Sequence, residues 1–270
     1  MLVDIGSHSL HLRCIGPWTN KPIVVLEAGA DGLASNWSAV RGLLASRVTT
    51  CAYDRAGAGW SEPGPVPRTM LQEVFELHTL LEVAHVIGPV VFVGQSSGAL
   101  HARLYTERYG RDVAGLVLVD PVHESGTQFS ARDGRWVRVR ERASDRRIPE
   151  PHRDGRLGPP STPEDDYLAE ELRQIYLSRK TSPVPLGDRP LIVLATGRQP
   201  APAGMSDDFW TGLRQEKDAQ TIDLALLSRN SRFVRDASGD REMLIDSAPL
   251  IVRAIDDVLE AVTKGLRLVP

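Results

Sequence analysis

The sequence has little net charge and lacks a long hydrophobic run. It carries 32 basic and 35 acidic residues, a net charge of −3 at pH 7, which gives no electrostatic reason to expect a nucleic-acid partner. No stretch approaches the roughly 18 uninterrupted apolar residues of a membrane span. We therefore expect no membrane partner and, in 270 residues, one large globular domain or two small ones.

Cysteine is also scarce. The only two, Cys14 and Cys51, are too few for a disulfide framework. The first sixteen residues lack the basic start and apolar core of a signal peptide. We therefore predict a cytoplasmic protein with two buried thiols, and a disulfide between neighbouring strands is the alternative.

Short apolar runs alternate with segments of helical periodicity along most of the chain. A hairpin is predicted at 3–15, and further strands are predicted at 22–26, 48–53, 90–93, 113–119, 191–195 and 232–234. Helices are predicted at 37–45, 69–84, 97–109, 209–227 and 248–264. This alternation predicts the α/β class, with a mostly parallel sheet covered by helices on both faces.

The segment 123–187 interrupts the alternation, because it is rich in arginine and proline and poor in apolar runs. Two helices are predicted inside it, at 127–144 and 164–179, with a loop at 153–163 between them. We therefore predict a core formed by residues 1–122 and 188–270, with a helical lid inserted at 123–187.

The pentapeptide G-Q-S-S-G at 94–98 joins a predicted strand to a predicted helix. G-x-S-x-G in this setting is a nucleophile elbow, a sharp turn that exposes a serine hydroxyl at the top of a sheet. Its glycines permit a strained backbone and a close approach of strand and helix. Ser96 is therefore the predicted nucleophile.

Three segments together resemble the α/β-hydrolase superfamily, and most of all its bacterial lipase, esterase and proline-iminopeptidase-like branch. They are the elbow, the loop L-E-A-G-A-D-G at 26–32 and the run Y-D-R-A-G-A-G-W-S at 53–61; the stretches 116–120 and 238–255 extend the resemblance. It implies an eight-stranded, mostly parallel sheet. It also implies an oxyanion hole formed by the amides of Ala30 and Ser97.

The resemblance further implies an acidic residue after one of two strands. Asp120 directly ends the predicted strand at 113–119, so we expect it to be the acid. Asp207 and Asp208, which follow the strand at 191–195 at some distance, are the alternative.

The sequence departs from the resemblance at the catalytic base. Relatives carry Ser-Gly-His before the last helix, whereas this chain reads S-G-D at 238–240, and none of its seven histidines follows His152. Asp240 thus takes the place of the histidine, and a carboxylate with an ordinary pKa near 4 is a poor base for a hydroxyl at pH 7. If Asp240 and Asp120 lie close together, they form a proton-sharing acid/base pair.

Four further residues are predicted to line the substrate pocket: His101, His123, Trp136 and Trp210. The two histidines are also alternatives for the missing base. No Cys/His cluster with zinc spacing, no G-x-G-x-x-G motif and no phosphate-binding loop occurs, so we expect no metal and no cofactor.

Three functions fit these residues. The first is a hydrolase in which Ser96 attacks an ester, lactone or similar acyl bond of a small organic molecule. The second is a lyase or cyclase, for example in natural-product biosynthesis, whose carboxylates serve acyl elimination, epoxide opening or ring closure. The third is a catalytically inactive binding protein, which the missing histidine favours. The intact elbow favours an enzyme, and we expect a hydrolase.

Overall fold

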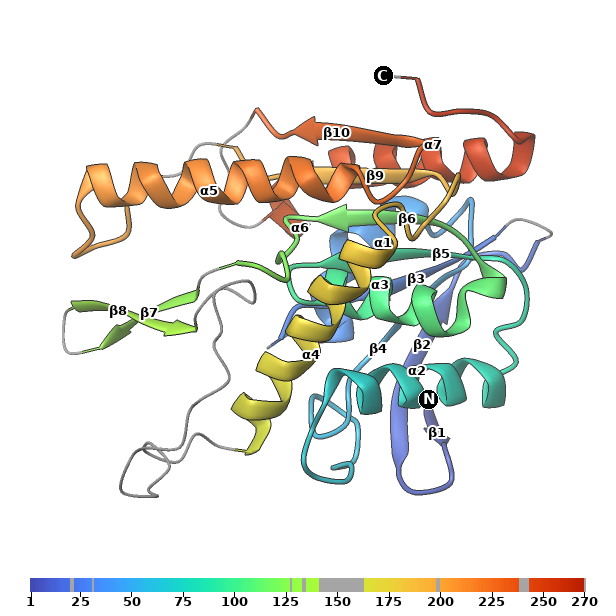
Figure 1. The fold of residues 1–270 in the computed structure, drawn as a ribbon. Coiled ribbons are helices and arrows are strands. Elements are labelled where there is room, and N and C mark those ends of the chain that lie inside the picture. The colour runs from blue at the N-terminus through green and yellow to red at the C-terminus, as the bar shows by residue number, and fades with distance from the viewer. Residues whose placement is uncertain are drawn as a thin grey trace.

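The structure is a computed structural model that describes residues 1–19, 22–30, 32–126, 128–132, 135–140, 163–197, 200–237 and 243–269. Its centre is an eight-stranded sheet with helices on both faces (Figure 1). In spatial order the strands are β1 (Leu2–Asp4), β2 (Ser9–Ile15), β4 (Thr50–Tyr53), β3 (Ile23–Glu27), β5 (Val90–Gln95), β6 (Val113–Val119), β9 (Leu191–Ala195) and β10 (Ser231–Arg235). The pairs β1–β2 and β2–β4 are antiparallel, and the other pairs are parallel.

The longer helices are α1 (Ser38–Leu44), α2 (Met70–Val83), α3 (Gly98–Tyr109), α4 (Pro163–Thr181), α5 (Asp207–Ala225) and α7 (Ala248–Lys264), and a short α6 (Met243–Asp246) precedes the last. Side chains of α2, α3 and α4 pack into one buried cluster, and those of α1 and α7 pack into another. Successive residues of β5 enter the two clusters alternately, Phe92 the first and Val93 the second. A strand covered on both faces has to be apolar throughout, as β5 is. The strand order and the helices on both faces of the sheet confirm the predicted α/β-hydrolase fold.

The predicted helix at 127–144 is wrong. Strands β7 (Gln128–Arg132) and β8 (Arg135–Arg140) form a separate two-stranded antiparallel sheet there. The run R-W-V-R-V-R at 135–140 alternates with the period of a strand, and D-G at 133–134 is a strong hairpin signal. Helix α4 agrees with the predicted helix at 164–179. Residues 141–162 lie outside the described part, and the division into core and lid stays a prediction.

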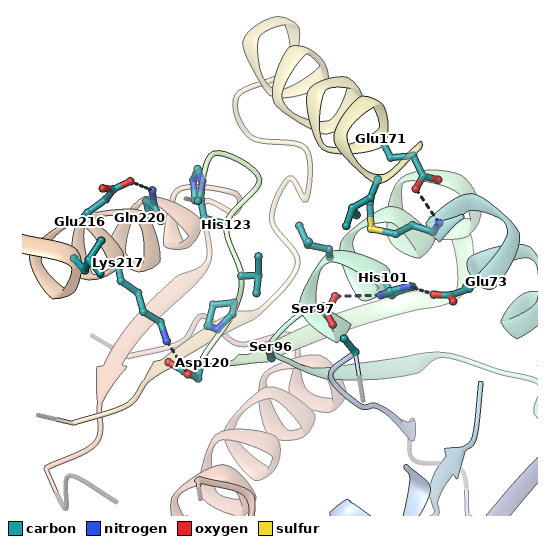
Figure 2. Close-up of a pocket in the computed structure, with 18 of the residues that line it drawn as sticks. Glu73, Ser96, Ser97, His101, Asp120, His123, Glu171, Glu216, Lys217 and Gln220 are labelled. Carbon is teal, nitrogen blue, oxygen red and sulfur yellow. Dashed lines mark hydrogen bonds and ion pairs between the residues drawn. The ribbon is translucent and has the colours of Figure 1, made fainter. Parts of the chain in front are cut away.

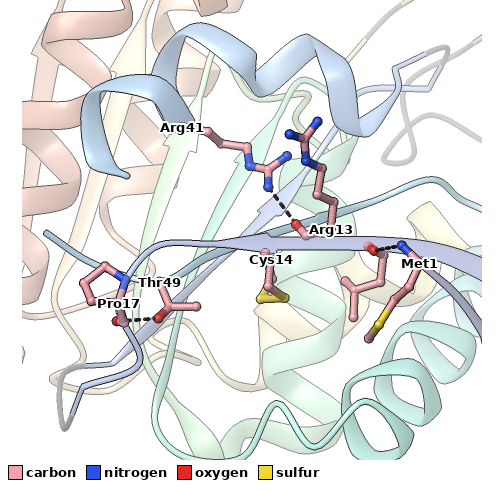
Figure 3. Close-up of a disulfide and its surroundings, with 8 residues drawn as sticks. Met1, Arg13, Cys14, Pro17, Arg41 and Thr49 are labelled. Atoms are coloured by element: carbon pink, nitrogen blue, oxygen red, sulfur yellow. Dashed lines mark hydrogen bonds between the residues drawn. A yellow bond between two sulfur atoms is a disulfide. The ribbon is translucent and has the colours of Figure 1, made fainter. Parts of the chain in front are cut away.

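The two cysteines are also paired, so the prediction of two thiols is wrong. Cys14 lies directly opposite Cys51 in the antiparallel pair β2–β4, and the two form a disulfide (Figure 3). Side chains facing each other across antiparallel strands are close enough to bond. The pairing depends on β4 lying between β2 and β3, a strand order that residue spacing does not reveal.

Among the described residues, no helix combines the length and apolar character that a bilayer crossing requires. Strands β5 and β6 are parallel neighbours, so their carboxyl ends lie side by side. Gln95 pairs with Val119 in the register of these strands, so Ser96 and Asp120 leave the sheet at the same level.

Candidate active site

Ser96 lies on a sharp turn between β5 and α3. Its φ of +54° is in the left-handed region, which is unusual for a residue with a side chain. The turn is held by β6 and the segment after it, because the Ser96 amide donates to the carbonyl of Val119 (3.0 Å) and the Ser96 carbonyl accepts from the amide of Val122 (3.1 Å). A Cβ on Gly94 or Gly98 would meet backbone atoms at 2.5 Å. This is the predicted elbow geometry.

The amide of Ser97 follows directly, at the N-cap of the twelve-residue helix α3. The first amides of a helix have no partner within it, and they lie at the positive end of the helix dipole. The Ser97 amide and the amide of Ala30 donate to no acceptor within the described residues. Both residues line the same cavity as Ser96, and their role as an oxyanion hole stays a prediction.

The loop that carries Ala30 is held from inside by Arg55. The guanidinium donates to the carbonyls of Ala28 (2.9 Å), Gly29 and Ala30 (3.1 Å). Arg55 is itself fixed by an ion pair with the fully buried Glu27. One buried cation therefore sets the direction of three consecutive peptide groups.

Asp120 is the second residue with a left-handed backbone at this edge, with φ of +44°. Its Oδ1 accepts from Thr196 Oγ1 (3.1 Å), and its Oδ2 accepts from Nζ of Lys217 on α5 (2.8 Å; Figure 2). In a Ser-His-Asp triad the carboxylate orients an imidazole. Asp120 instead holds an ammonium, which has three N–H donors and no lone pair.

His101 lines the cavity, but both of its ring nitrogens are engaged. Nδ1 lies 3.1 Å from the Ser97 carbonyl oxygen, and Nε2 lies 2.5 Å from Oε2 of Glu73 (Figure 2). Burial opposes the charged ring, but the hydrogen bond to Glu73 and the field of Glu27 outweigh it and raise the pKa of His101. An imidazolium that donates at both nitrogens cannot take a proton from Ser96.

His123 is engaged in the same way, by different partners. Its Nδ1 accepts from the amide of Ser125 (3.0 Å), and its Nε2 lies 2.9 Å from Oδ2 of Asp223 and 3.2 Å from Nη1 of Arg179. Figure 2 places the ring on the loop after Asp120, away from the elbow. Neither pocket histidine offers a free lone pair to Ser96.

The cavity measures about 670 Å³, and one of its walls is helix α5. The predicted site residues that line it are Ser96, Ser97, Ala30, Asp120, His101, His123 and Trp210. The structure therefore brings seven of the nine predicted residues together. Asp240 and the side chain of Trp136 lie outside the described part of the chain.

Sequence reasoning missed Arg55, Glu73, Arg214 and Lys217, all of which line the cavity. Arg55 stands in the run at 53–61 and could have been noticed there. Residues 210, 214 and 217 share one face of a helix by their spacing, but nothing in the sequence tells that this face meets the elbow.

A sequence profile of the alpha/beta hydrolase fold family matches residues 21–152. An AB hydrolase superfamily protein of Gibberella zeae is 34% identical over 112 residues, which cover 40% of this chain and 35% of that protein. The matches to the first three curated relatives span only 18% to 39% of those proteins' lengths.

Solved structures with the same fold cover almost the whole chain. A thermophilic esterase from Thermogutta terrifontis has a TM-score of 0.62 at 18% identity, over 97% of this chain and 98% of that chain. The enol-lactonase from Burkholderia xenovorans LB400 has a TM-score of 0.64 at 17% identity, over 96% and 99% of the two chains. At such identities the likeness shows the fold.

The chain therefore has the α/β-hydrolase fold, and the family profile matches just under half of its residues. The solved structures, which include an esterase and an enol-lactonase, support the prediction of an enzyme. The fold alone does not define the reaction, because it hosts many chemistries.

Proposed function

We propose that the protein hydrolyses an ester, lactone or similar acyl bond of a small organic molecule, with Ser96 as the nucleophile. The observation that carries the proposal is the geometry at the elbow. Ser96 is held at a φ of +54° beside the amides of Ala30 and Ser97, in a cavity of about 670 Å³. A serine on a strained turn, beside two amides that have no acceptor among the residues described, suits attack on a carbonyl carbon.

In this reaction Ser96 Oγ attacks the carbonyl carbon, and the two amides stabilise the oxyanion. Collapse breaks the bond to the alcohol, which leaves with a proton, and water then attacks the acyl-enzyme and releases the acid. Removing one such amide typically costs about 3–4 kcal/mol of transition-state stabilisation.

The acceptor of the Ser96 proton has to replace the missing histidine. Asp240 is the acceptor we propose, paired with Asp120 as the second carboxylate of the site. This assignment rests on the sequence alone, because Asp240 lies outside the described residues. The engagement of both nitrogens in His101 and in His123 supports it indirectly.

A lyase or cyclase is the second candidate, and the Asp120–Lys217 pair favours it. A carboxylate that accepts protons and an ammonium that donates them lie 2.8 Å apart at the edge of the cavity. Such a pair could move a proton during elimination or ring closure without any acyl-enzyme. Ser96 would then orient the substrate rather than attack it.

Labelling with a fluorophosphonate, read by intact mass, separates the two candidates. We expect one adduct on the wild type and none on Ser96→Ala. A matched control is Ser178→Ala, which removes a surface serine that bonds Glu107 outside this cavity and should label like the wild type. A folded wild type that takes up no label would contradict the hydrolase and favour the lyase, cyclase or binding protein.

The cellular compartment needs its own test. The cytoplasmic location predicted from the sequence conflicts with the Cys14–Cys51 disulfide, because disulfides rarely persist in a reducing cytosol. The disulfide supports an oxidising compartment. Alkylating thiols at the moment of cell lysis distinguishes the two, since a cytoplasmic protein should take up two alkyl groups and an oxidised one none.

A further inference from the structure

Six side chains that carry or can carry a positive charge line the cavity in the described part of the chain. Five of them have a carboxylate partner: Arg55, Arg68, His101, His123 and Lys217. The sixth, Arg214 on α5, has none among the described residues. An arginine is charged at every relevant pH, so Arg214 is a cation of the cavity wall for which the described residues supply no counter-ion.

The Arg214 side chain is nevertheless held in place. Its Nη2 donates to the carbonyl of Gly197 at 2.5 Å, and its guanidinium carbon lies 5.8 Å from the centre of the Trp210 ring. A guanidinium has five N–H donors, and a single one is used by these contacts. The remaining donors form a planar fork, which matches the two oxygens of a carboxylate.

The acidic side chains of the cavity are already engaged. Asp120 accepts from Lys217, Glu73 accepts from His101, and Glu171 accepts from the amides of Met70 and Leu71 at the start of α2. Glu216, two residues after Arg214, accepts from Gln220 at 3.0 Å (Figure 2). Among the described residues, an incoming anion would therefore meet Arg214 without a carboxylate partner and carboxylates that are partly neutralised.

We propose that Arg214 binds a carboxylate group of the substrate, so that the enzyme acts on esters or lactones that also carry a carboxylate. The rest of such a molecule has apolar surface to contact, since Leu100, Val122 and Met205 line the same cavity. The nature of the reacting bond rests on the proposed function, but binding of the anion does not. The two ideas can therefore fail separately.

The test is a binding measurement that requires no turnover. Titration calorimetry compares 4-phenylbutyrate with 4-phenylbutanamide, two molecules of the same shape of which one is an anion. We expect the wild type to bind the carboxylate about 10- to 100-fold more tightly, the range for hydrogen bonds to a charged group. Arg214→Gln should remove most of this preference and leave binding of the amide unchanged. Arg214→Lys should keep part of it, because the charge stays and the fork is lost.

The chain offers a matched control in Arg235. Its guanidinium carbon lies 5.6 Å from the ring centre of Phe233, much as Arg214 lies by Trp210, but it pairs with Asp218 and does not line the cavity. Arg235→Gln should keep the full preference. If Arg214→Gln does not fold, Arg214→Ala replaces it in the same comparison.

Three results would overturn the proposal: equal affinity of the wild type for the two compounds, no binding of the carboxylate at millimolar concentration, or a preference that survives Arg214→Gln. A carboxylate preference without fluorophosphonate labelling of Ser96 would reject the hydrolase and keep the anion site. Labelling without the preference would do the reverse.

Discussion

The pair His101–Glu73 allows a prediction whose size follows from the structure. Glu73→Gln removes one carboxylate from a group of three cations. Its Oε2 lies 2.5 Å from His101 Nε2 and 3.9 Å from Arg55 Nε, and its Oε1 lies 3.7 Å from Arg68 Nη2. Burial disfavours the carboxylate, but the hydrogen bond to His101 and the three positive charges outweigh it and lower the pKa of Glu73.

Two opposite charges 4 Å apart attract by about 4 kcal/mol at an effective dielectric constant near 20. The side chain of Glu73 is 19% exposed, and both arginines keep a second carboxylate partner, so the loss should be below that of a fully buried pair. We expect Glu73→Gln to lower the free energy of unfolding by about 2–4 kcal/mol.

The same pair makes stability depend on pH in a defined direction. The folded-state pKa of His101 is raised, so its contribution is complete below about pH 6.5, the ordinary histidine pKa, and is lost as the pH rises through the folded value. The pKa of Glu73 is lowered, so its contribution is present above its ordinary pKa and is lost as the pH falls through the lowered value. Glu73→Gln should remove the dependence due to Glu73 and weaken the one due to His101, which keeps the field of Glu27.

Denaturant unfolding across the pH range measures the stability, and nitrogen NMR of the imidazole rings measures the protonation of His101. The control is Glu82→Gln, which breaks an exposed pair with His78 and should change stability by less than about 1 kcal/mol. The reasoning is refuted if the wild-type His101 ring is neutral at pH 7, or if Glu73→Gln leaves its titration unchanged.

Two further predictions concern the disulfide and the missing base. The bond between Cys14 and Cys51 closes a loop with a sequence separation of 37, so the Cys14→Ser/Cys51→Ser variant should lose about 4 kcal/mol of unfolding free energy, as should the reduced wild type, measured in denaturant. Equal stability of oxidised and reduced protein would show that the strands do not need the link. Asp240→His should raise hydrolysis of a p-nitrophenyl ester by placing an imidazole where the resemblance to α/β-hydrolases predicts one; a folded variant with no gain would mean that the elbow and the amides are not arranged for hydrolysis.

The core elements could be predicted from the sequence because each carries its own local signal. The strand before the elbow is β-branched and continuous, and G-Q-S-S-G marks the turn that follows it. Strands β7 and β8 were not predicted because the arginines among their residues resemble the polar face of a helix, although the sequence D-G at 133–134 is a hairpin signal.

Contacts between elements far apart in the sequence were beyond prediction. The approach of Lys217 to Asp120 joins α5 to the end of β6, and the Cys14–Cys51 bond depends on which strands are neighbours. Whether a pocket histidine can act as a base depends on its hydrogen-bond partners. For His101 on α3 the partner is Glu73 on α2, and the sequence does not show that these two helices meet there.

The grip of Arg55 on the carbonyls of Ala28, Gly29 and Ala30 has a consequence for exchanging loops between enzymes of this fold. Within the described part of the loop, the hydrogen bonds of this cation all go to main-chain oxygens, so they do not depend on which side chains these residues carry. The conformation of the loop, however, depends on the buried Arg55–Glu27 ion pair, because Arg55 binds the loop carbonyls. A grafted loop would keep its sequence and lose its conformation unless the buried pair were transferred with it, because amides that are not fixed before the substrate arrives must be ordered during the reaction.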